Sequence, residues 1–209
     1  MNVALIGASG TIGSRILEEL LSRGHRVKAI VRHAGKLNPH PNLTVAQADV
    51  LDPRNLEDLL QGLDAVISAY APPLENPKLL LDATQGLLEA LRRSGIRRFI
   101  MVGGAGSLEV APGKRLVESD EFPPAWKPIA LAHANALELL RPSDLDWTSV
   151  SPAAYIAPGE KTGHFRLGTD QLLTDAQGVS RISAEDFAIA LVDELEQPKH
   201  IQRRFTVAY

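Results

Sequence analysis

Cysteine is absent from the 209-residue sequence. Its absence excludes disulfide bonds, zinc sites built on thiolates and any mechanism with a cysteine nucleophile. A chain without cysteine suits a reducing compartment, and we expect the protein to be cytoplasmic. No run approaches the roughly 20 apolar residues that a membrane span requires, and the sequence opens on a strand-like run rather than a basic signal peptide. We therefore expect no membrane association.

The sequence also lacks a strong excess of charge of either sign. It has 22 Lys and Arg residues against 25 Asp and Glu residues, a formal net charge of -3. This balance gives no reason to expect nucleic acid as a partner. Apolar residues make up 44% of the chain and charged residues 22%, which favours a compact core over disorder. The length fits one domain, residues 1–209.

Two common catalytic motifs are missing as well. The six histidines show no metal-ligand spacing, and no HExxH sequence occurs, so we expect no metal site. The GxSxG turn that carries the nucleophile of many serine hydrolases is also absent. Hydrolysis by either route is therefore not indicated.

What is present is an alternation of short apolar runs and amphipathic segments. This order predicts a Rossmann-like α/β fold, with a doubly wound parallel sheet covered by helices on both faces. A proline-rich segment, 103–128, reads as loop, and 154–182 as a small substrate-side insertion. Ser183 to Asp186 resembles a capping box before the last helix. The predicted strands are 3–6, 27–31, 43–46, 65–68, 98–102, 147–150 and 205–208, and the predicted helices are 11–23, 53–61, 77–93, 129–140 and 187–195.

A glycine-rich loop joins the first strand to the first helix. Its sequence is GASGTIG, residues 7–13. Gly7 can form the tight turn, Gly10 can let a pyrophosphate approach the backbone, and Gly13 can let the helix pack closely. Ser9, Thr11 and Ile12 lie between them, where the helix start offers free N–H groups to phosphates. A purely structural glycine turn is the alternative, but the strand–loop–helix order favours dinucleotide binding.

Arg32 indicates which dinucleotide binds. It lies 19 residues after Gly13, at the end of the second predicted strand, where sites selective for NAD usually carry an acid. A carboxylate there repels a 2′-phosphate, whereas a guanidinium binds it. The nearby His33 and Lys36 add basic character. The sequence thus favours NADP(H) over NAD(H), and a solvated basic loop is the alternative.

Longer stretches resemble the atypical short-chain dehydrogenases/reductases. Within that group the chain is similar to the NmrA-like and NADH-flavin reductase proteins, relatives of the biliverdin-IXβ/flavin reductases. The stretches that carry the resemblance are GASGTIG, VKAIVR, QADVLD, RRFIMVGGAGSL, LDWTSVSPAAYI and the segment from GHFRLGTDQLL to LVDELEQP. They cover most of the chain.

The resemblance implies further cofactor contacts. Asp49 and Val50 match the pair beside the adenine, and Ser68, Ala69 and Tyr70 match the loop beside the nicotinamide ribose. Pro152 and Ala153 match the loop behind the nicotinamide. Gly103 and Gly104 stand where typical members have a serine pair. Asp49 could instead be a turn acid, and Tyr70 a packing aromatic. Tyr70, Trp126, Tyr155 and Phe165 are candidate walls of the acceptor site.

The catalytic residues of the resembled group are replaced. Typical members use a tyrosine as proton donor and, four residues later, a lysine that lowers its pKa. Here those positions are Ile129 and His133, and the serine position is Gly104, with Ser107 three residues on. His133 and Ser107 stay as catalytic candidates, and His133 can equally contact the cofactor ribose or lie at a helix surface.

The sequence leaves three functions open. Hydride transfer to a flat, electron-poor acceptor, such as FMN, FAD or riboflavin as substrate rather than bound group, needs mainly stacking of two rings. A redox sensor that binds NADP(H) without turnover fits the missing residues too. The third function is an epimerase-like enzyme acting on an unknown small metabolite, although the missing residues argue against a standard sugar epimerase. We expect a small-molecule partner, and the chain to be a monomer or a homodimer.

Overall fold

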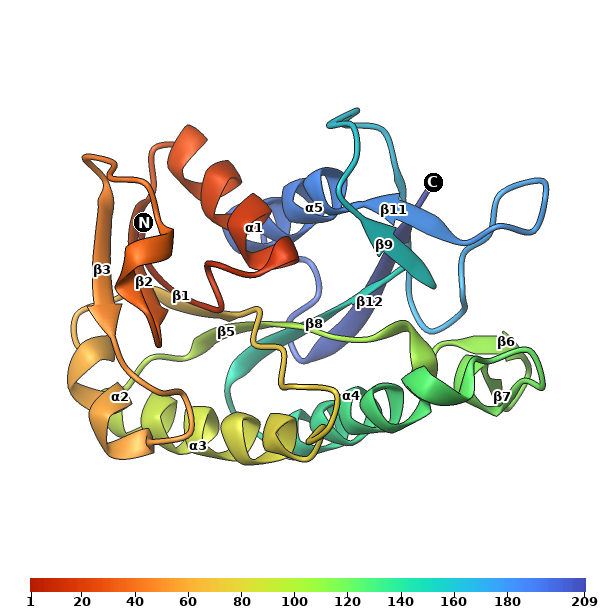
Figure 1. Ribbon diagram of the computed structural model, residues 1–209, viewed down its shortest axis with the longest axis horizontal. Helices are drawn as coiled ribbons and strands as arrows, with labels where there is room; N and C mark the ends of the chain where they lie inside the picture. The colour runs from red at the N-terminus through yellow and green to blue at the C-terminus, as the bar shows by residue number, and fades with distance from the viewer.

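The computed structural model describes the backbone of residues 1–209 and every side chain except those of Lys36 and Pro53. Its centre is an eight-stranded sheet with the strand order β10-β12-β8-β5-β4-β1-β2-β3 (Figure 1). Neighbouring strands are parallel, except that β10 runs antiparallel to β12. These strands are β1 (Asn2–Ile6), β2 (Arg26–Val31), β3 (Leu43–Gln47), β4 (Ala65–Ser68), β5 (Arg98–Val102), β8 (Asp146–Pro152), β10 (Arg166–Gly168) and β12 (Arg203–Ala208). The predicted Rossmann-like fold class is confirmed.

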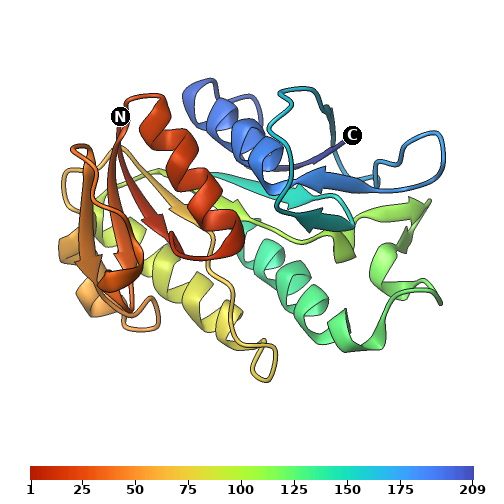
Figure 2. The same ribbon diagram turned by 45° about the horizontal axis from the view of Figure 1, so that its top comes forward.

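Helices cover both faces of the sheet (Figures 1 and 2). They are α1 (Thr11–Ser22), α2 (Pro53–Leu60), α3 (Leu79–Ser94), α4 (Lys127–Leu140) and α5 (Ala184–Glu196). On one face α1 and α5 pack over a core that contains Phe187 and Phe205. On the other, α2, α3 and α4 pack over a core that contains Phe99 and Trp147. Strands buried on both faces explain why their sequences are continuous apolar runs.

Local signals place several helix ends correctly. Asp52 caps α2 by accepting a hydrogen bond from the Arg54 N–H. Gly95 ends α3 with a φ of 75°, in the left-handed region that favours glycine. α4 begins at Lys127, two residues before the predicted start, because Pro128 occupies the first turn and fits there without an N–H.

The segments predicted as loops contain further short elements. Residues 103–128 hold the 3-10 turns η2 (Ala105–Ser107), η3 (Leu116–Glu118) and η4 (Pro124–Trp126) and the hairpin of β6 (Glu109–Ala111) and β7 (Lys114–Arg115). Further on, β9 (Tyr155–Ala157) pairs with β11 (Arg181–Ser183) beside the carboxyl end of β8 (Figure 2). Three-residue strands are too short to show a period in the sequence.

The predicted capping box at the start of α5 is only half formed. The Ser183 hydroxyl accepts a hydrogen bond from the Asp186 N–H at 3.0 Å, as predicted. The Asp186 carboxylate does not return to the Ser183 backbone, whose N–H donates to the Tyr209 hydroxyl instead. Asp186 binds the 162–163 backbone, so tertiary contacts replace the local bond.

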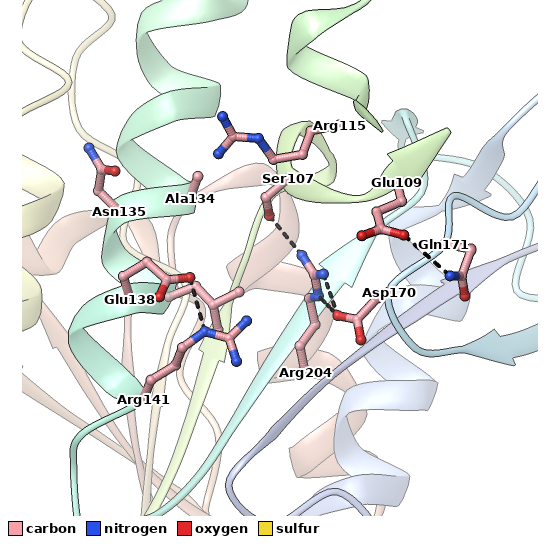
Figure 3. Close-up of a pocket in the computed structure, with 11 residues that line it drawn as sticks. Ser107, Glu109, Arg115, Ala134, Asn135, Glu138, Arg141, Asp170, Gln171 and Arg204 are labelled. Carbon is pink, nitrogen blue, oxygen red and sulfur yellow. Dashed lines mark hydrogen bonds and ion pairs between the residues drawn. The ribbon is translucent and has the colours of Figure 1, made fainter. Parts of the chain in front are cut away.

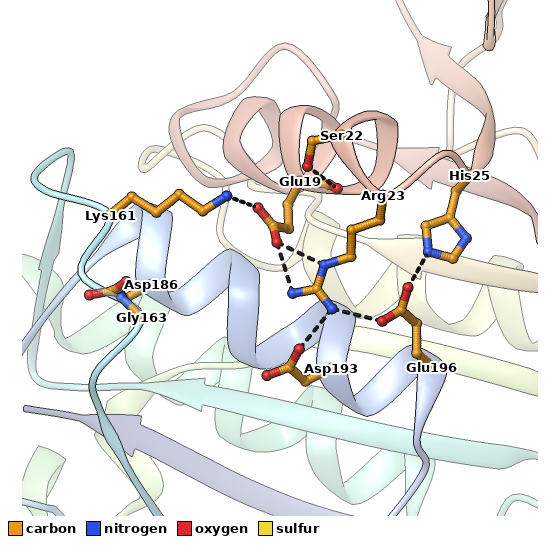
Figure 4. A network of polar contacts seen from close by, with 9 residues as sticks. All are labelled: Glu19, Ser22, Arg23, His25, Lys161, Gly163, Asp186, Asp193 and Glu196. Atoms are coloured by element: carbon orange, nitrogen blue, oxygen red, sulfur yellow. Dashed lines mark hydrogen bonds and ion pairs between the residues drawn. The ribbon is translucent and has the colours of Figure 1, made fainter.

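A network of side-chain ion pairs joins α1 to α5 and to the loop that follows β9 (Figure 4). The Arg23 guanidinium contacts Glu19 at 2.8 Å and both Asp193 and Glu196 at 2.7 Å. Glu19 also accepts from Lys161 at 2.5 Å. Burial alone would raise the pKa of Glu19, but the hydrogen bonds from Lys161 and Arg23 hold it below its usual value. The network therefore depends on an ionised Glu19.

None of the helices described here is both long and apolar enough to cross a bilayer. Among the described side chains, no three His, Asp or Glu residues form a group that could hold a metal ion.

Candidate functional site

The carboxyl ends of the parallel strands bring most of the predicted residues to one edge of the sheet. Register pairs Ile6 with Ile30 and Ser68, Ser68 with Met101, and Val102 with Val150. The loops that follow β1, β2, β4, β5 and β8 therefore begin side by side. In open α/β sheets, ligands bind beyond this edge.

The glycine loop is shaped by contacts that exclude side chains. Gly7 has a φ of +80°, and a Cβ there would lie 2.4 Å from the carbonyl oxygen of Ala69. A Cβ on Gly13 would lie 2.0 Å from the carbonyl oxygen of Gly7. The loop after β1 is thus wedged between α1 and the loop after β4. Gly7 plays the predicted turn role, and Gly13 packs the helix against the loop itself.

The start of α1 is left open for an anion. Gly10 is the N-cap and supplies no side-chain hydrogen bond, and the first turn has no acidic residue. Ser9, Gly10 and Thr11 are exposed, and Ile12 is half-buried. The first N–H groups of an α-helix have no partner within the helix, and the dipole is positive at this end. The residues present therefore fit the diphosphate of a dinucleotide.

The next loops place a cation and an aromatic ring near each other. Arg32 is exposed directly after β2, and Tyr70 is half-buried after β4. Burial raises the pKa of Tyr70, the charges of Asp49 and Asp82 raise it further, and Arg32 opposes them. These four side chains therefore share one electrostatic environment. The side chain of Lys36, predicted to add positive charge, lies outside the described residues, and His33 is exposed.

The residues expected around the adenine and ribose divide into exposed and buried ones. Asp49 is exposed, and its Oδ1 accepts a turn hydrogen bond from the Leu51 N–H at 3.0 Å. This is the turn role weighed as the alternative, and it leaves the second carboxylate oxygen for a ligand. Val50 and Ser68 are buried. These two can shape the site but offer little surface to a ligand.

In the loop that follows β5, two glycines allow the backbone to pack closely against β8 and α4. A Cβ on Gly103 would lie 2.8 Å from the Ser149 hydroxyl oxygen, and one on Gly104 would lie 2.8 Å from the Cβ of His133. The imidazole of His133 packs on Gly104, in the space that a serine would need. Burial lowers the pKa of His133 to about 4, so the ring is neutral at pH 7. His133 is therefore not the charged imidazolium that would donate a proton as a general acid.

Ile129, Pro152 and Ala153 carry no side-chain group that could donate a proton. Ile129 is half-buried against the core under α2, α3 and α4. Pro152 and Ala153 are buried at the end of β8. They are suited to support a ligand from behind.

The four predicted wall residues do not share one place. Trp126 is 53% exposed at the start of α4, and Tyr155 is 66% exposed on β9. Phe165 instead packs against the core of the α1 and α5 face, whereas Tyr70 packs against the opposite core. Phe165 lines a separate cavity of about 240 Å³ with Phe205. The structure does not bring Phe165 to the acceptor side, because β10 follows the outer edge of the sheet.

Ser107 is the last residue of η2, in the loop after β5. It lines a polar cavity of about 420 Å³ between α4, the β6–β7 hairpin and β12 (Figure 3). There its hydroxyl accepts a hydrogen bond from Arg204 at 2.8 Å, and Arg204 also binds Asp170. The side chain has a structural partner, and the prediction that it replaces the displaced catalytic serine finds no support in this geometry.

Sequence reasoning missed how the loop after β9 is held. Asp186 is fully buried and accepts four hydrogen bonds, from the Thr162 and Gly163 N–H groups, the Thr162 hydroxyl and the Tyr209 hydroxyl. Gly159 is held in the same way by Glu185, which also binds Arg15 of α1. The acid pair after Ser183 was visible in the sequence, but its partners are distant in the chain.

Comparison with known proteins is consistent with this site. The family model described as NAD(P)H-binding matches residues 7–198. That range contains the glycine loop, Arg32, His133 and the α5 helix.

Three solved structures are similar over the whole chain. One, a "putative exported protein" from Burkholderia pseudomallei, is 47% identical with a TM-score of 0.90, and covers 100% of both chains. A "putative epimerase" from Bacteroides thetaiotaomicron is 43% identical with a TM-score of 0.94, covering 100% of this chain and 96% of its own. A "putative NADH-flavin reductase" from Streptococcus pneumoniae is 39% identical with a TM-score of 0.90, covering 100% and 99%.

Proposed function

The chain belongs to the NAD(P)H-binding family, and from this premise we propose that it is a reductase that transfers hydride to free flavin or to a similarly flat, electron-poor acceptor. The observation that carries the proposal is a contrast within one site. The glycine loop and the open start of α1 fit a diphosphate, whereas Ile129, neutral His133 and Gly104, at the positions that resemble the catalytic ones, offer no group to protonate an alkoxide. Reduction of a carbonyl to an alcohol needs such a proton donor.

Flavin reduction makes smaller demands on the protein. When bound, the reduced nicotinamide supplies a hydride, which flavin N5 accepts to give a delocalised anion. The protein then has to hold two flat rings in contact and exclude water. The solved structure named as a "putative NADH-flavin reductase", 39% identical over the full chain, supports this choice of acceptor. FMN, FAD or riboflavin would bind as substrate and leave after reduction.

NADP(H) is the proposed cofactor. Arg32 is exposed at the end of β2, close enough to Tyr70 and Asp49 to share their electrostatic environment. A guanidinium at this point can bind a 2′-phosphate in a bidentate manner. Asp49, Tyr70 and the carbonyl of Ala69 would line the path from the adenine toward the nicotinamide.

The acceptor would lie beyond β5 and β8. The proposed wall residues are Tyr70 in the loop after the neighbouring β4, Trp126 before α4 and Tyr155 on β9. The protein would act as a monomer or a homodimer on a small molecule. A cytoplasmic location remains our proposal, although one similar structure is named as an exported protein.

Two measurements test the function. NADPH oxidation is followed with and without FMN, and the affinities for NADPH and NADH are measured by calorimetry. Flavin-dependent turnover at a steady rate, well above the rate without protein, is the expected result. Tight NADPH binding with no turnover on flavins, quinones or dyes would instead identify a redox sensor.

A third outcome distinguishes an isomerase. The similar structure named as a "putative epimerase" makes this the second candidate. An epimerase would bind the oxidised cofactor and consume none of it, so NADP⁺ retained through purification without net NADPH oxidation would favour it.

A further inference from the structure

We propose that His133 is a neutral hydrogen-bond donor to the acceptor, and that its Nε2–H selects flat acceptors with a carbonyl oxygen, such as flavins and quinones. This inference rests on the proposed function, because it assigns a role within the same site. It follows from how the imidazole is held, from the different surroundings of its two nitrogens and from its charge.

The ring is fixed by the backbone of Gly104. A Cβ at position 104 would lie 2.8 Å from Cβ, 3.1 Å from Cγ and 3.4 Å from Cδ2 of His133, so the ring sits directly against this glycine. Gly104 belongs to the loop that leaves the carboxyl end of β5. The imidazole is therefore held at the edge where ligands bind in sheets of this kind, on the rigid frame of α4.

The two ring nitrogens have different surroundings. Nδ1 is shut off from solvent and has no hydrogen-bond partner. Nε2 is not among the buried unpartnered atoms of the described side chains, and the residue keeps partial exposure, so Nε2 is the nitrogen that a ligand can reach. A buried N–H without an acceptor is rarer in proteins than a buried lone pair without a donor. The proton of the neutral ring therefore belongs on Nε2.

The ring remains uncharged over the working range of pH. Burial, the only cause of the shift, lowers the pKa of His133 to about 4, and no charged side chain of α4, η2 or β8 contributes to it. A neutral imidazole can polarise an oxygen without transferring a proton to it, as an electrophile. Its effect should therefore not change with pH above about 5.

This donor explains which acceptors the site would favour. In the hydride transfer, the C4–H bond of the dihydronicotinamide breaks. The hydride forms an N5–H bond with a flavin, or a new bond from hydrogen to the ring system of a quinone. The acceptor gains two electrons and one proton, and a further proton comes from water. Negative charge accumulates on the conjugated carbonyl oxygens, and a preorganised donor stabilises it. An acceptor without an oxygen gains nothing from His133.

Nuclear magnetic resonance tests the tautomer independently of activity. Long-range ¹⁵N–¹H spectra of the whole protein, assigned by comparison with His133→Gln, report which nitrogen carries the proton. We expect the Nε2–H form with no charging down to about pH 5. An Nδ1–H form, or a ring that charges near pH 6.5, would overturn the proposal.

Kinetics test the selectivity. His133→Leu should lower kcat with FMN or menadione by about 10- to 100-fold, less than a localised oxyanion would lose. His133→Gln, which keeps an N–H donor, should retain most of the activity. With N-methylphenazinium, a flat hydride acceptor without oxygen, both variants should match the wild type once the rate without protein is subtracted.

The results separate the two proposals. If the wild type reduces flavins and His133→Leu loses nothing, the donor role is wrong and the reductase stands. An equal loss with all acceptors and a raised Kd for NADPH would make His133 a cofactor contact and also overturn the donor role. If the wild type reduces no acceptor, the reductase itself is wrong.

Discussion

His133 occupies the space that a side chain at Gly104 would need: the two positions are close enough that a Cβ on residue 104 would lie 2.8 Å from the Cβ of His133. Neither atom is the free end of a flexible side chain, so either the loop after β5 or α4 must shift to admit a larger residue at 104. The side chains that positions 104 and 133 can carry are therefore restricted together by one packed contact.

The contact predicts the cost of a methyl group at position 104. Gly104→Ala should lower the free energy of unfolding by about 2 kcal/mol, since overpacking in a tight site typically costs 1–3 kcal/mol. Gly35→Ala is the control, because among the described atoms, its chain neighbours aside, none lies within 4 Å of a Cβ there, and it should change stability by less than about 0.5 kcal/mol. Urea unfolding measures both, and equal values would refute the packing argument.

Gly13 should be less replaceable still. Gly13→Ala places a Cβ 2.0 Å from the Gly7 carbonyl oxygen, so the loop after β1 must move or α1 must tilt. We expect the Kd for NADPH to rise at least about tenfold, because a displacement of the phosphate-binding amides weakens every hydrogen bond they make. Calorimetric titration gives the Kd, with Gly62→Ala before the amino end of β4 as control, because that glycine lies at the opposite edge of the sheet. An unchanged Kd would mean that the diphosphate binds elsewhere.

Arg32 should decide between the two nicotinamide cofactors. Arg32→Glu should weaken NADPH binding by about 100-fold, through the loss of a charge-assisted contact and the gain of repulsion. NADH has no 2′-phosphate, so its affinity should change by less than about threefold. Arg26→Glu is a charge-matched control on the opposite end of the same strand. Equal losses for both cofactors would rule out the phosphate contact.

Ser107 is expected to have no role in hydride transfer. Its hydroxyl accepts a hydrogen bond from Arg204, in a cavity that α4, the β6–β7 hairpin and β12 line. Ser107→Ala should leave kcat within about threefold of the wild type and lower stability by about 1 kcal/mol, the usual value of one hydrogen bond. Steady-state kinetics with FMN check this. A loss as large as that of His133→Leu would restore Ser107 as a catalytic candidate.

Asp186 should contribute acid-sensitive stability. Burial alone would raise its pKa, but hydrogen bonds from Thr162, Gly163 and Tyr209 hold it below the usual 3.8. A depressed carboxyl pKa adds stability that is present above about pH 4 and lost as the pH falls through the folded-state value. Asp186→Asn should therefore be less stable by about 2–3 kcal/mol at pH 7, and this deficit should shrink toward pH 3. Urea unfolding at several pH values tests the trend, and a constant deficit would contradict it.

The sequence is sufficient where local geometry decides. The strand–glycine loop–helix at residues 2–22, the cap at Asp52 and the end at Gly95 need only neighbouring residues, and all three appear as predicted. The parallel sheet follows from the alternation of its elements. These features fix the edge at which the site lies.

Distant contacts decide the features that the sequence did not reveal. Phe165 looks like a wall residue, but pairing of β10 with β12 carries it to the α5 face. Asp186 resembles the acid of a local capping box, but its carboxylate accepts hydrogen bonds from the backbone of residues 162 and 163 instead. Ser107 looks like a displaced catalytic serine until Arg204, 97 residues later, is found on its hydroxyl. Each case depends on partners that no local window contains.

The close fit of residues 104 and 133 also restricts how the protein can be redesigned. A serine at position 104 would need the space that His133 fills, and a longer side chain at 133 would meet the backbone of Gly104. Residues 104 and 133 should therefore be varied together, and not singly, in any redesign of this edge of the sheet.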